Sequence, residues 1–173
     1  MAPVFWGMLD AKGPFESYGE VIGHIPQVEH TYRYFHSAYS HMNEHQLAIS
    51  ETTFNGREEL RNPDGLLHYW DLMQLALQRA RTAREAIDVM AGLVAEHGYR
   101  STAESFAIAD PEEVWLMEMI GTGPGGPGAV WVARSRGEST VARPMQAMEC
   151  FNGHRDQPRR GQLSSRCADT AAH

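Results

Sequence analysis

The chain has 173 residues, of which 42% are hydrophobic and 21% are charged, values close to those of globular proteins. This length suits one domain with a hydrophobic core, and no apolar run approaches the roughly 20 residues that a membrane helix needs. The formal net charge of −7 argues against nucleic acid as a partner, because binding to phosphates depends on clustered Lys and Arg.

The first ten residues contain neither a basic leader nor a small-residue cleavage site. We therefore expect the protein to reside in the cytosol.

The first predicted strands lie in residues 30–54, which are rich in Tyr, Phe, Thr and Ile. Residues 46–50 roughly alternate polar with apolar side chains, as a half-buried strand does, and we expect one or two strands here. Asn55 and Gly56 supply a turn signal, and residues 61–65 supply a second one before the pattern changes.

A helical period of apolar residues begins at Leu66. Leu66, Trp70, Met73 and Leu77 recur at intervals of three and four residues, which places them along one stripe of a helix. We therefore predict a first helix that buries this stripe.

A second helix is predicted directly after the first. Thr82 and Glu85 have the spacing of a capping box, in which each side chain satisfies an otherwise unpaired backbone N–H. Gly98 stands where a left-handed C-terminal cap is expected. The predicted buried stripe consists of Ala83, Ile87, Met90 and Val94. The two helices are expected to pack side by side.

Further strands are predicted after the helices. Residues 105–108 and 114–120 form an antiparallel hairpin, and residues 129–133 form another short strand. Asp110, Glu112 and Glu113 are interpreted as turn and surface carboxylates. The order of strands, two helices and strands predicts an α+β fold, with two adjacent helices packed on antiparallel strands.

The charge of the chain changes after these elements. Residues 1–133 hold 8 basic and 18 acidic side chains, whereas residues 134–173 hold 7 Arg and 4 acidic side chains. We expect the basic stretch to be a poorly ordered tail. The two cysteines, Cys150 and Cys167, both lie in it, without the spacing of a zinc site or of a disulfide framework.

His41, Glu44 and His45 match the zinc peptidase pattern H-x-x-E-H, in which two His bind zinc and the Glu activates its water. That pattern works on a helix, where positions four apart share a face. Here the residues that follow alternate as in a strand, and no further ligand is evident. Histidines that flank a different motif are the alternative interpretation.

Residues 121–126 satisfy G-x-G-x-x-G and follow a predicted strand. A dinucleotide site also needs a helix that starts at the glycines, so that its N-terminal N–H groups meet the pyrophosphate. Because a strand is predicted next, we interpret the segment as a flexible hairpin loop.

Several short segments between residues 23 and 133 resemble one known family. In chain order they are IPQV at 25–28, HTY at 30–32, MNEHQLAI at 42–49, ETT at 51–53, GREEL at 56–60, TAREAI at 82–87, AIADP at 107–111 and GAVWVA at 128–133. In order and content they are similar to segments of the N-terminal-nucleophile dipeptidases, the dipeptidase A and secernin group.

This resemblance implies an αββα sandwich and hydrolysis of dipeptides without a cofactor or a metal. In the family, a cysteine that becomes the first residue attacks the amide carbonyl, and its own α-amino group, with a pKa near 8, acts as the base. The resemblance also implies that Asn43, in an Asn-Glu element after a strand, is catalytic and donates a hydrogen bond to the oxyanion.

Both ends of the chain depart from the family pattern. Residues 1–22 contain neither the family's cysteine nor its Arg-Asn-x-Asp element, and residues 134–173 lack its His-Ala-Asn-Gln element. We therefore expect a divergent start at 1–22, a partial dipeptidase-like αββα domain at 23–133 and a divergent tail at 134–173. The chain is expected to lack the nucleophile.

A truncated gene model, a frame change and a degenerate paralogue would each explain these departures. A non-catalytic, secernin-like interaction protein is the alternative function, and a zinc peptidase that uses His41 and His45 is a third.

Overall fold

The structure, a computed structural model, describes residues 1–6, 20–35, 40–54, 56–125, 128–135 and 140–143. The expected basic tail lies outside the described residues from residue 144 onward, and so do both cysteines.

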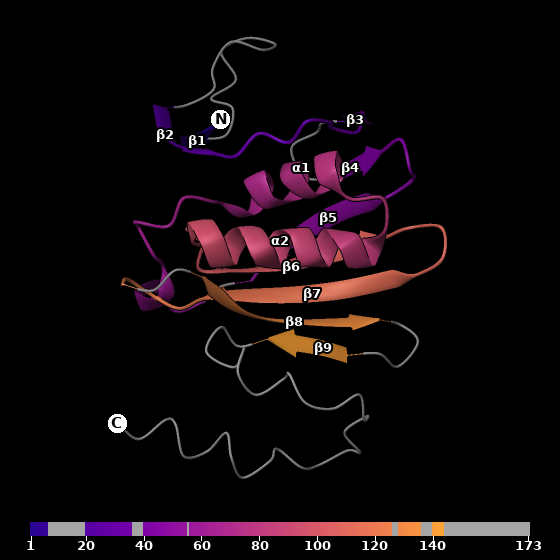
Figure 1. The fold of residues 1–173 in the computed structure, drawn as a ribbon. Coiled ribbons are helices and arrows are strands. Elements are labelled where there is room, and N and C mark those ends of the chain that lie inside the picture. The colour runs from indigo at the N-terminus through magenta and orange to yellow at the C-terminus, as the bar shows by residue number, and fades with distance from the viewer. Residues whose placement is uncertain (7–19, 36–39, 55, 126–127, 136–139, 144–173) are drawn as a thin grey trace, which may run out of the picture.

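In the described ranges, seven antiparallel strands form the main sheet and follow one another in chain order across it (Figure 1). They are β3 (Tyr34–Phe35), β4 (Ser40–Asn43), β5 (Ala48–Thr53), β6 (Ala103–Ala109), β7 (Val114–Gly121), β8 (Ala129–Ser135) and β9 (Thr140–Arg143). The strands predicted after the helices are confirmed as β6, β7 and β8. The described part of residues 30–54 holds three strands rather than one or two, and β3 was missed because two residues are too few to show an alternating pattern.

Two further strands, β1 (Ala2–Trp6) and β2 (Glu20–Ile25), pair antiparallel in a small separate sheet. Val4 and Ile25 are buried in the same hydrophobic core as the main sheet and the helices, so the small sheet packs against that core. The segment boundary expected at residues 22 and 23 falls inside β2, and the one at residues 133 and 134 falls inside β8.

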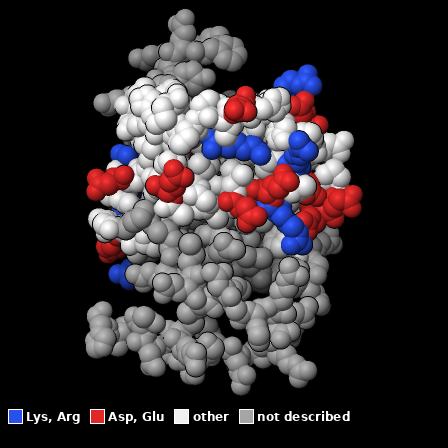
Figure 2. All heavy atoms as spheres, in the orientation of Figure 1, with Lys and Arg blue, Asp and Glu red and all other residues white. Residues whose placement is uncertain are grey.

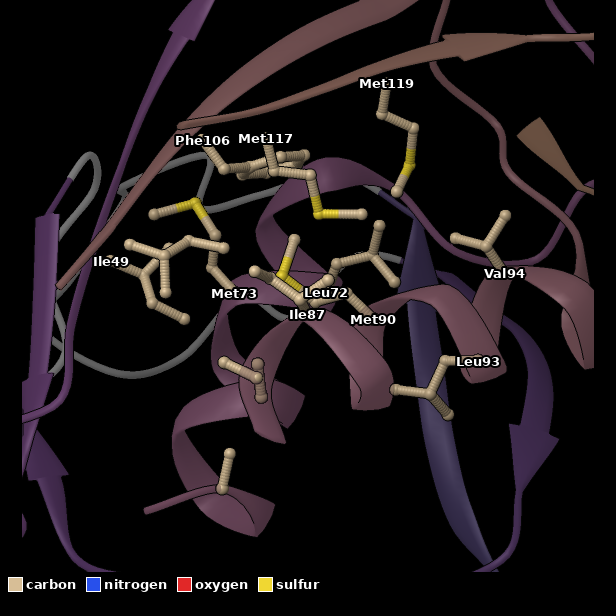
Figure 3. Close-up of a cluster of buried hydrophobic side chains, with 14 of the residues drawn as sticks. Ile49, Leu72, Met73, Ile87, Met90, Leu93, Val94, Phe106, Met117 and Met119 are labelled. Atoms are coloured by element: carbon tan, nitrogen blue, oxygen red, sulfur yellow. The ribbon is translucent and has the colours of Figure 1, made fainter. Parts of the chain in front are cut away.

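Two helices, α1 (Tyr69–Arg79) and α2 (Ala83–His97), lie side by side over one face of the main sheet (Figure 1). Buried and exposed side chains alternate strictly along β7, because one face of the sheet meets the helices and the other does not. Figure 3 shows Phe106 and Met117 of the sheet facing Met73 and Met90 of the helices. The predicted α+β arrangement of two adjacent helices on antiparallel strands is therefore confirmed.

The predicted buried stripe of the first helix was partly wrong. Met73 and Leu77 are buried as expected, but Leu66 precedes the helix and Trp70 is only half-buried. Leu72 and Ala76 take their places in the core. The helix begins at Tyr69, and from there the 3.6-residue period brings residues 72, 73, 76 and 77 onto one face.

In α2 all four residues of the predicted stripe are buried. Thr82 caps the helix as expected, since its Oγ1 accepts a hydrogen bond from the Glu85 N–H at 3.2 Å. The Glu85 carboxylate accepts a hydrogen bond from the Arg81 N–H at 2.8 Å. In a capping box it would accept from the N–H of Thr82, the next residue. Gly98 ends the helix with a φ of 80° and a ψ of 156°, so its φ is positive but its conformation is not left-handed helical.

Asp110 does more than close a surface turn, contrary to our interpretation from the sequence. Its Oδ1 accepts hydrogen bonds from the Glu112 and Glu113 N–H groups at 2.8 and 2.9 Å. Its Oδ2 accepts from the N–H of Ala83, the first residue of α2, at 2.7 Å. Asp110 therefore joins the β6–β7 turn to the positive end of the second helix.

The outer surfaces of the two layers differ in character. Figure 2 shows acidic and basic side chains intermixed on the helix side, where Arg84, Glu85 and Asp88 of α2 are exposed. On the opposite face of the sheet, Leu116 and Val130 are 49% and 46% exposed. The described residues thus form one helix layer on one main sheet, and the outer face of the sheet exposes several large apolar side chains. None of the described helices is long and apolar enough to cross a membrane.

Candidate functional site

Asn43, the predicted catalytic residue, ends β4 and is buried, with 5% of its surface exposed. Its Nδ2 donates hydrogen bonds to the carbonyl oxygens of Leu77 at 2.9 Å and Ala80 at 2.8 Å. Its Oδ1 accepts from the N–H groups of His45 at 2.9 Å and Leu47 at 3.2 Å. The amide of Asn43 therefore joins the β4–β5 turn to the C-terminal end of α1.

An oxyanion donor needs an N–H that points at the reacting oxygen. Both Nδ2 hydrogens of Asn43 are engaged with helix carbonyls, and its backbone N–H donates to the carbonyl oxygen of Leu47 at 2.9 Å. A catalytic role for Asn43 stays a prediction, and it requires one of these bonds to be released.

Two motifs that are separate in the sequence, HTY at 30–32 and MNEHQLAI at 42–49, meet beside Asn43. The Arg33 guanidinium donates two hydrogen bonds to Glu44, at 2.9 and 2.7 Å, and the Arg33 N–H donates a third at 3.0 Å. Tyr32 packs edge-on against His45, with ring centroids 4.5 Å apart, and its hydroxyl accepts from Arg81 Nε at 2.7 Å. The hydrogen bonds from Arg33 hold the pKa of Glu44 below its ordinary value. These contacts therefore join the two motifs to each other and to Arg81, which follows the end of α1.

The two histidines of the H-x-x-E-H pattern lie in different surroundings. His41 is on β4 and is 5% exposed, whereas His45 is exposed in the turn beside Tyr32. The pattern spans a strand and a turn rather than a helix. Among the residues that the structure describes, no group of three or more His, Cys, Asp or Glu side chains could hold a metal ion. The zinc peptidase hypothesis therefore gains no geometric support.

The glycine-rich segment begins at Gly121, the last residue of β7, and the next described element is the strand β8 rather than the helix that a dinucleotide site needs. The Gly123 N–H donates to the carbonyl oxygen of Leu60 at 2.9 Å, and Gly123 has a φ of 84°. This part of the loop is therefore held by the short helix η1 (Glu58–Leu60).

A shallow, open pocket of about 460 Å³ lies across β3, β4, β5 and β6. Its walls are mostly apolar, and they are formed by Phe35, His41, Met42, Ala48, Ile49, Ser50, Ala107 and Ala109. Phe35 and Met42 are 80% and 45% exposed, so both side chains are accessible to a ligand. Asn43 is not among the lining residues. The structure thus separates the predicted catalytic residue from the pocket.

Sequence reasoning also missed a pair of acids on the helix side of the sheet. Glu104 of β6 is 1% exposed, and Glu51 of β5 lies within hydrogen-bonding reach of it. The sequence does indicate this site. Residues two apart in a strand share a face, so Glu51 lies on the same face as the buried Leu47 and Ile49. A Glu at an apolar position of an alternating strand indicates a buried polar site.

One comparison with known proteins identifies the family. Residues 28–148, which are 121 of the 173 residues, match peptidase family C69. The match includes the motifs that meet at Asn43, both helices and every strand from β3 to β9. The chain therefore belongs to peptidase family C69, the dipeptidase A family.

Proposed function

We propose that this chain is a dipeptidase-type domain that binds short peptides but does not cleave them by itself. Its family membership over residues 28–148 is the observation that carries the proposal. In this family the expected reaction is amide hydrolysis by a cysteine thiolate beside its own amino group.

The nucleophile is the part of this chemistry that the chain does not supply. Residues 1–149 contain no cysteine, and Cys150 and Cys167 lie outside the described residues. A described Ser or Thr would need an adjacent base to become nucleophilic. Ser50, the hydroxyl residue that lines the pocket, has only His41 as a second polar neighbour there, and His41 is buried.

The outer face of the main sheet supports the finer proposal of an αββα sandwich. Val114, Leu116, Ile120 and Val130 are between 37% and 50% exposed on that face. A sheet that packs against a second sheet needs such an apolar face, and the two layers lie roughly 10 Å apart. We propose that this face is the inner surface of the sandwich and that the peptide substrate lies at its margin.

The pocket beside Phe35 and Met42 is the proposed peptide site. Its apolar walls fit an apolar side chain of a dipeptide, whereas a peptide without side chains would find few partners in it.

Titration of the isotope-labelled chain with leucyl-leucine, followed by NMR, tests this site. We expect shifts of the Met42, Ala48 and Ala107 amides, and weaker shifts with glycyl-glycine. Ala107→Glu should abolish the response, whereas Val130→Glu, a matched change on the same face outside the pocket, should preserve it. Equal responses from both variants would contradict the proposed site.

A non-catalytic interaction protein is the second candidate, because the same exposed apolar face could bind a protein partner. In that case leucyl-leucine would leave the pocket amides unshifted, and the purified chain would unfold cooperatively without aggregating.

A further inference from the structure

Glu51 and Glu104 lie on adjacent strands and on the face of the sheet that meets the helices. Thr53 of β5 is directly opposite Glu104 of β6, and its Oγ1 donates to Glu104 Oε2 at 3.3 Å. Phe106 follows Glu104 by two residues on β6, so it lies on the same face of the sheet, and it is fully buried. The Glu104 carboxyl group is therefore inside the domain rather than at its surface.

The two carboxyl groups lack sufficient hydrogen-bond donors. Glu104 Oε1 and Glu51 Oε2 are buried, and neither accepts a hydrogen bond from any other described group. Each carboxyl group is nevertheless within hydrogen-bonding reach of the other. Two ionised carboxylates in this position would repel each other and would leave these oxygens unsatisfied.

Within the described part of the chain, no positively charged group acts on the Glu104 carboxyl group. Thr53 of β5 donates a hydrogen bond to Glu104, and Tyr99, from the segment between α2 and β6, lies beside both acids. The Tyr99 hydroxyl is fully buried and lies near enough to both carboxyl groups for their charges to raise its pKa further, after burial itself. Because no cation compensates the two acids, a proton on one of them is the simplest way to satisfy both.

We propose that Glu51 and Glu104 share one proton in the folded domain, so that folding takes up a proton and alkaline pH destabilises the contact between the sheet and the helices. A single O–H···O bond between the two groups satisfies both orphan oxygens and leaves one negative charge instead of two. Burial, and then the hydrogen bond with Glu51, raises the pKa of Glu104 to about 8, which agrees with this arrangement.

The sign of the pH dependence follows from proton binding. Between the ordinary value of 4.5 and about 8, the folded chain holds a proton that the unfolded chain has released. Stability therefore falls as pH rises through this window, and the unfolding equilibrium constant increases by up to about tenfold for each pH unit. Asp71, a buried acid at the start of α1, has its pKa raised to about 7 by burial and adds its own pH dependence.

Urea unfolding of the full chain between pH 5 and pH 9 tests the proposal. The unfolding constant of the unchanged chain should rise with pH. Glu104→Gln should show a shallower rise, because its amide donates to Glu51 without a titrating proton, and the Asp71 contribution remains in both proteins. The control Glu118→Gln, on the exposed face of β7, should follow the unchanged chain.

A parallel pH profile for Glu104→Gln and the unchanged chain would overturn the proposal. So would stabilisation of the unchanged chain by Ca²⁺ or Mg²⁺ at pH 8 that Glu104→Gln abolishes, since the pair would then hold a cation rather than a proton. If Glu104→Gln does not fold, a carbon-13 titration of the glutamate carboxyl groups in the unchanged chain decides the question. One of them should stay protonated above pH 6, and ordinary titration of every glutamate near pH 4.5 would refute the shared proton.

Discussion

At the scale of single residues, Asn43 shows how a motif residue can be structural in ways that the sequence does not reveal. The motif that contains it was visible, but its partners Leu77 and Ala80 are 34 and 37 residues away. No local pattern indicates that an amide will cap the carbonyls of a distant helix end. The position of Asn43 was therefore predictable, whereas its hydrogen bonds were not.

Asn43→Ala should destabilise the chain by about 2–4 kcal/mol, because it leaves two helix carbonyls and two turn N–H groups without their partner. Urea unfolding measures this, with the exposed Gln27→Ala as a control that should change the free energy of unfolding by less than about 0.5 kcal/mol. An unchanged stability for Asn43→Ala would show that the amide is not needed to hold the turn, and it would favour the catalytic role instead.

At the scale of elements, the sequence predicted those strands and helices whose own side chains show a period. The second helix and β7 have complete apolar stripes and were predicted closely. The two residues of β3, and the strands β1 and β2, depend on pairing with a partner, which a local pattern does not contain. The stripe of α1 was partly wrong because its first turn begins three residues later than the apolar pattern does.

Asp110 links the β6–β7 turn to the start of α2, and its removal should lower the stability of the chain. Asp110→Ala is expected to lower the free energy of unfolding by about 1–2 kcal/mol at pH 7, because the N–H of Ala83 at the start of α2 loses its acceptor. Glu112→Ala, in the same turn but with an exposed side chain, is the matched control and should have little effect. Amide hydrogen exchange at Ala83 would locate the change, and equal losses in both variants would contradict the assignment.

The contribution of Asp110 also has a defined pH dependence. Burial alone would raise its pKa, but hydrogen bonds from the N–H groups of Ala83, Glu112 and Glu113 outweigh burial and hold the pKa below the ordinary 3.8. A lowered folded pKa means that the stabilisation is present above 3.8 and is lost as pH falls through the folded value. The difference between Asp110→Ala and the unchanged chain should therefore shrink in strong acid.

At the scale of the whole molecule, a helix layer with a charged surface covers one face of the main sheet (Figure 2). The opposite face exposes apolar side chains such as Leu116 and Val130. The fold class followed from the order of elements, and the family followed from short motifs spread over the chain. The location of the pocket could not be predicted in this way, because its walls come from four strands whose register is set only by pairing.

The chain belongs to peptidase family C69, and we propose that it lacks a working nucleophile. The most direct test is the release of free amino acids from a dipeptide panel by purified residues 1–173, beside a Cys150→Ser, Cys167→Ser double variant. We expect neither protein to exceed the rate in buffer, and we expect thiol-blocking reagents to change nothing. Sustained turnover by the unchanged chain would contradict the claim, and its loss in the double variant would assign the nucleophile to one of the two cysteines.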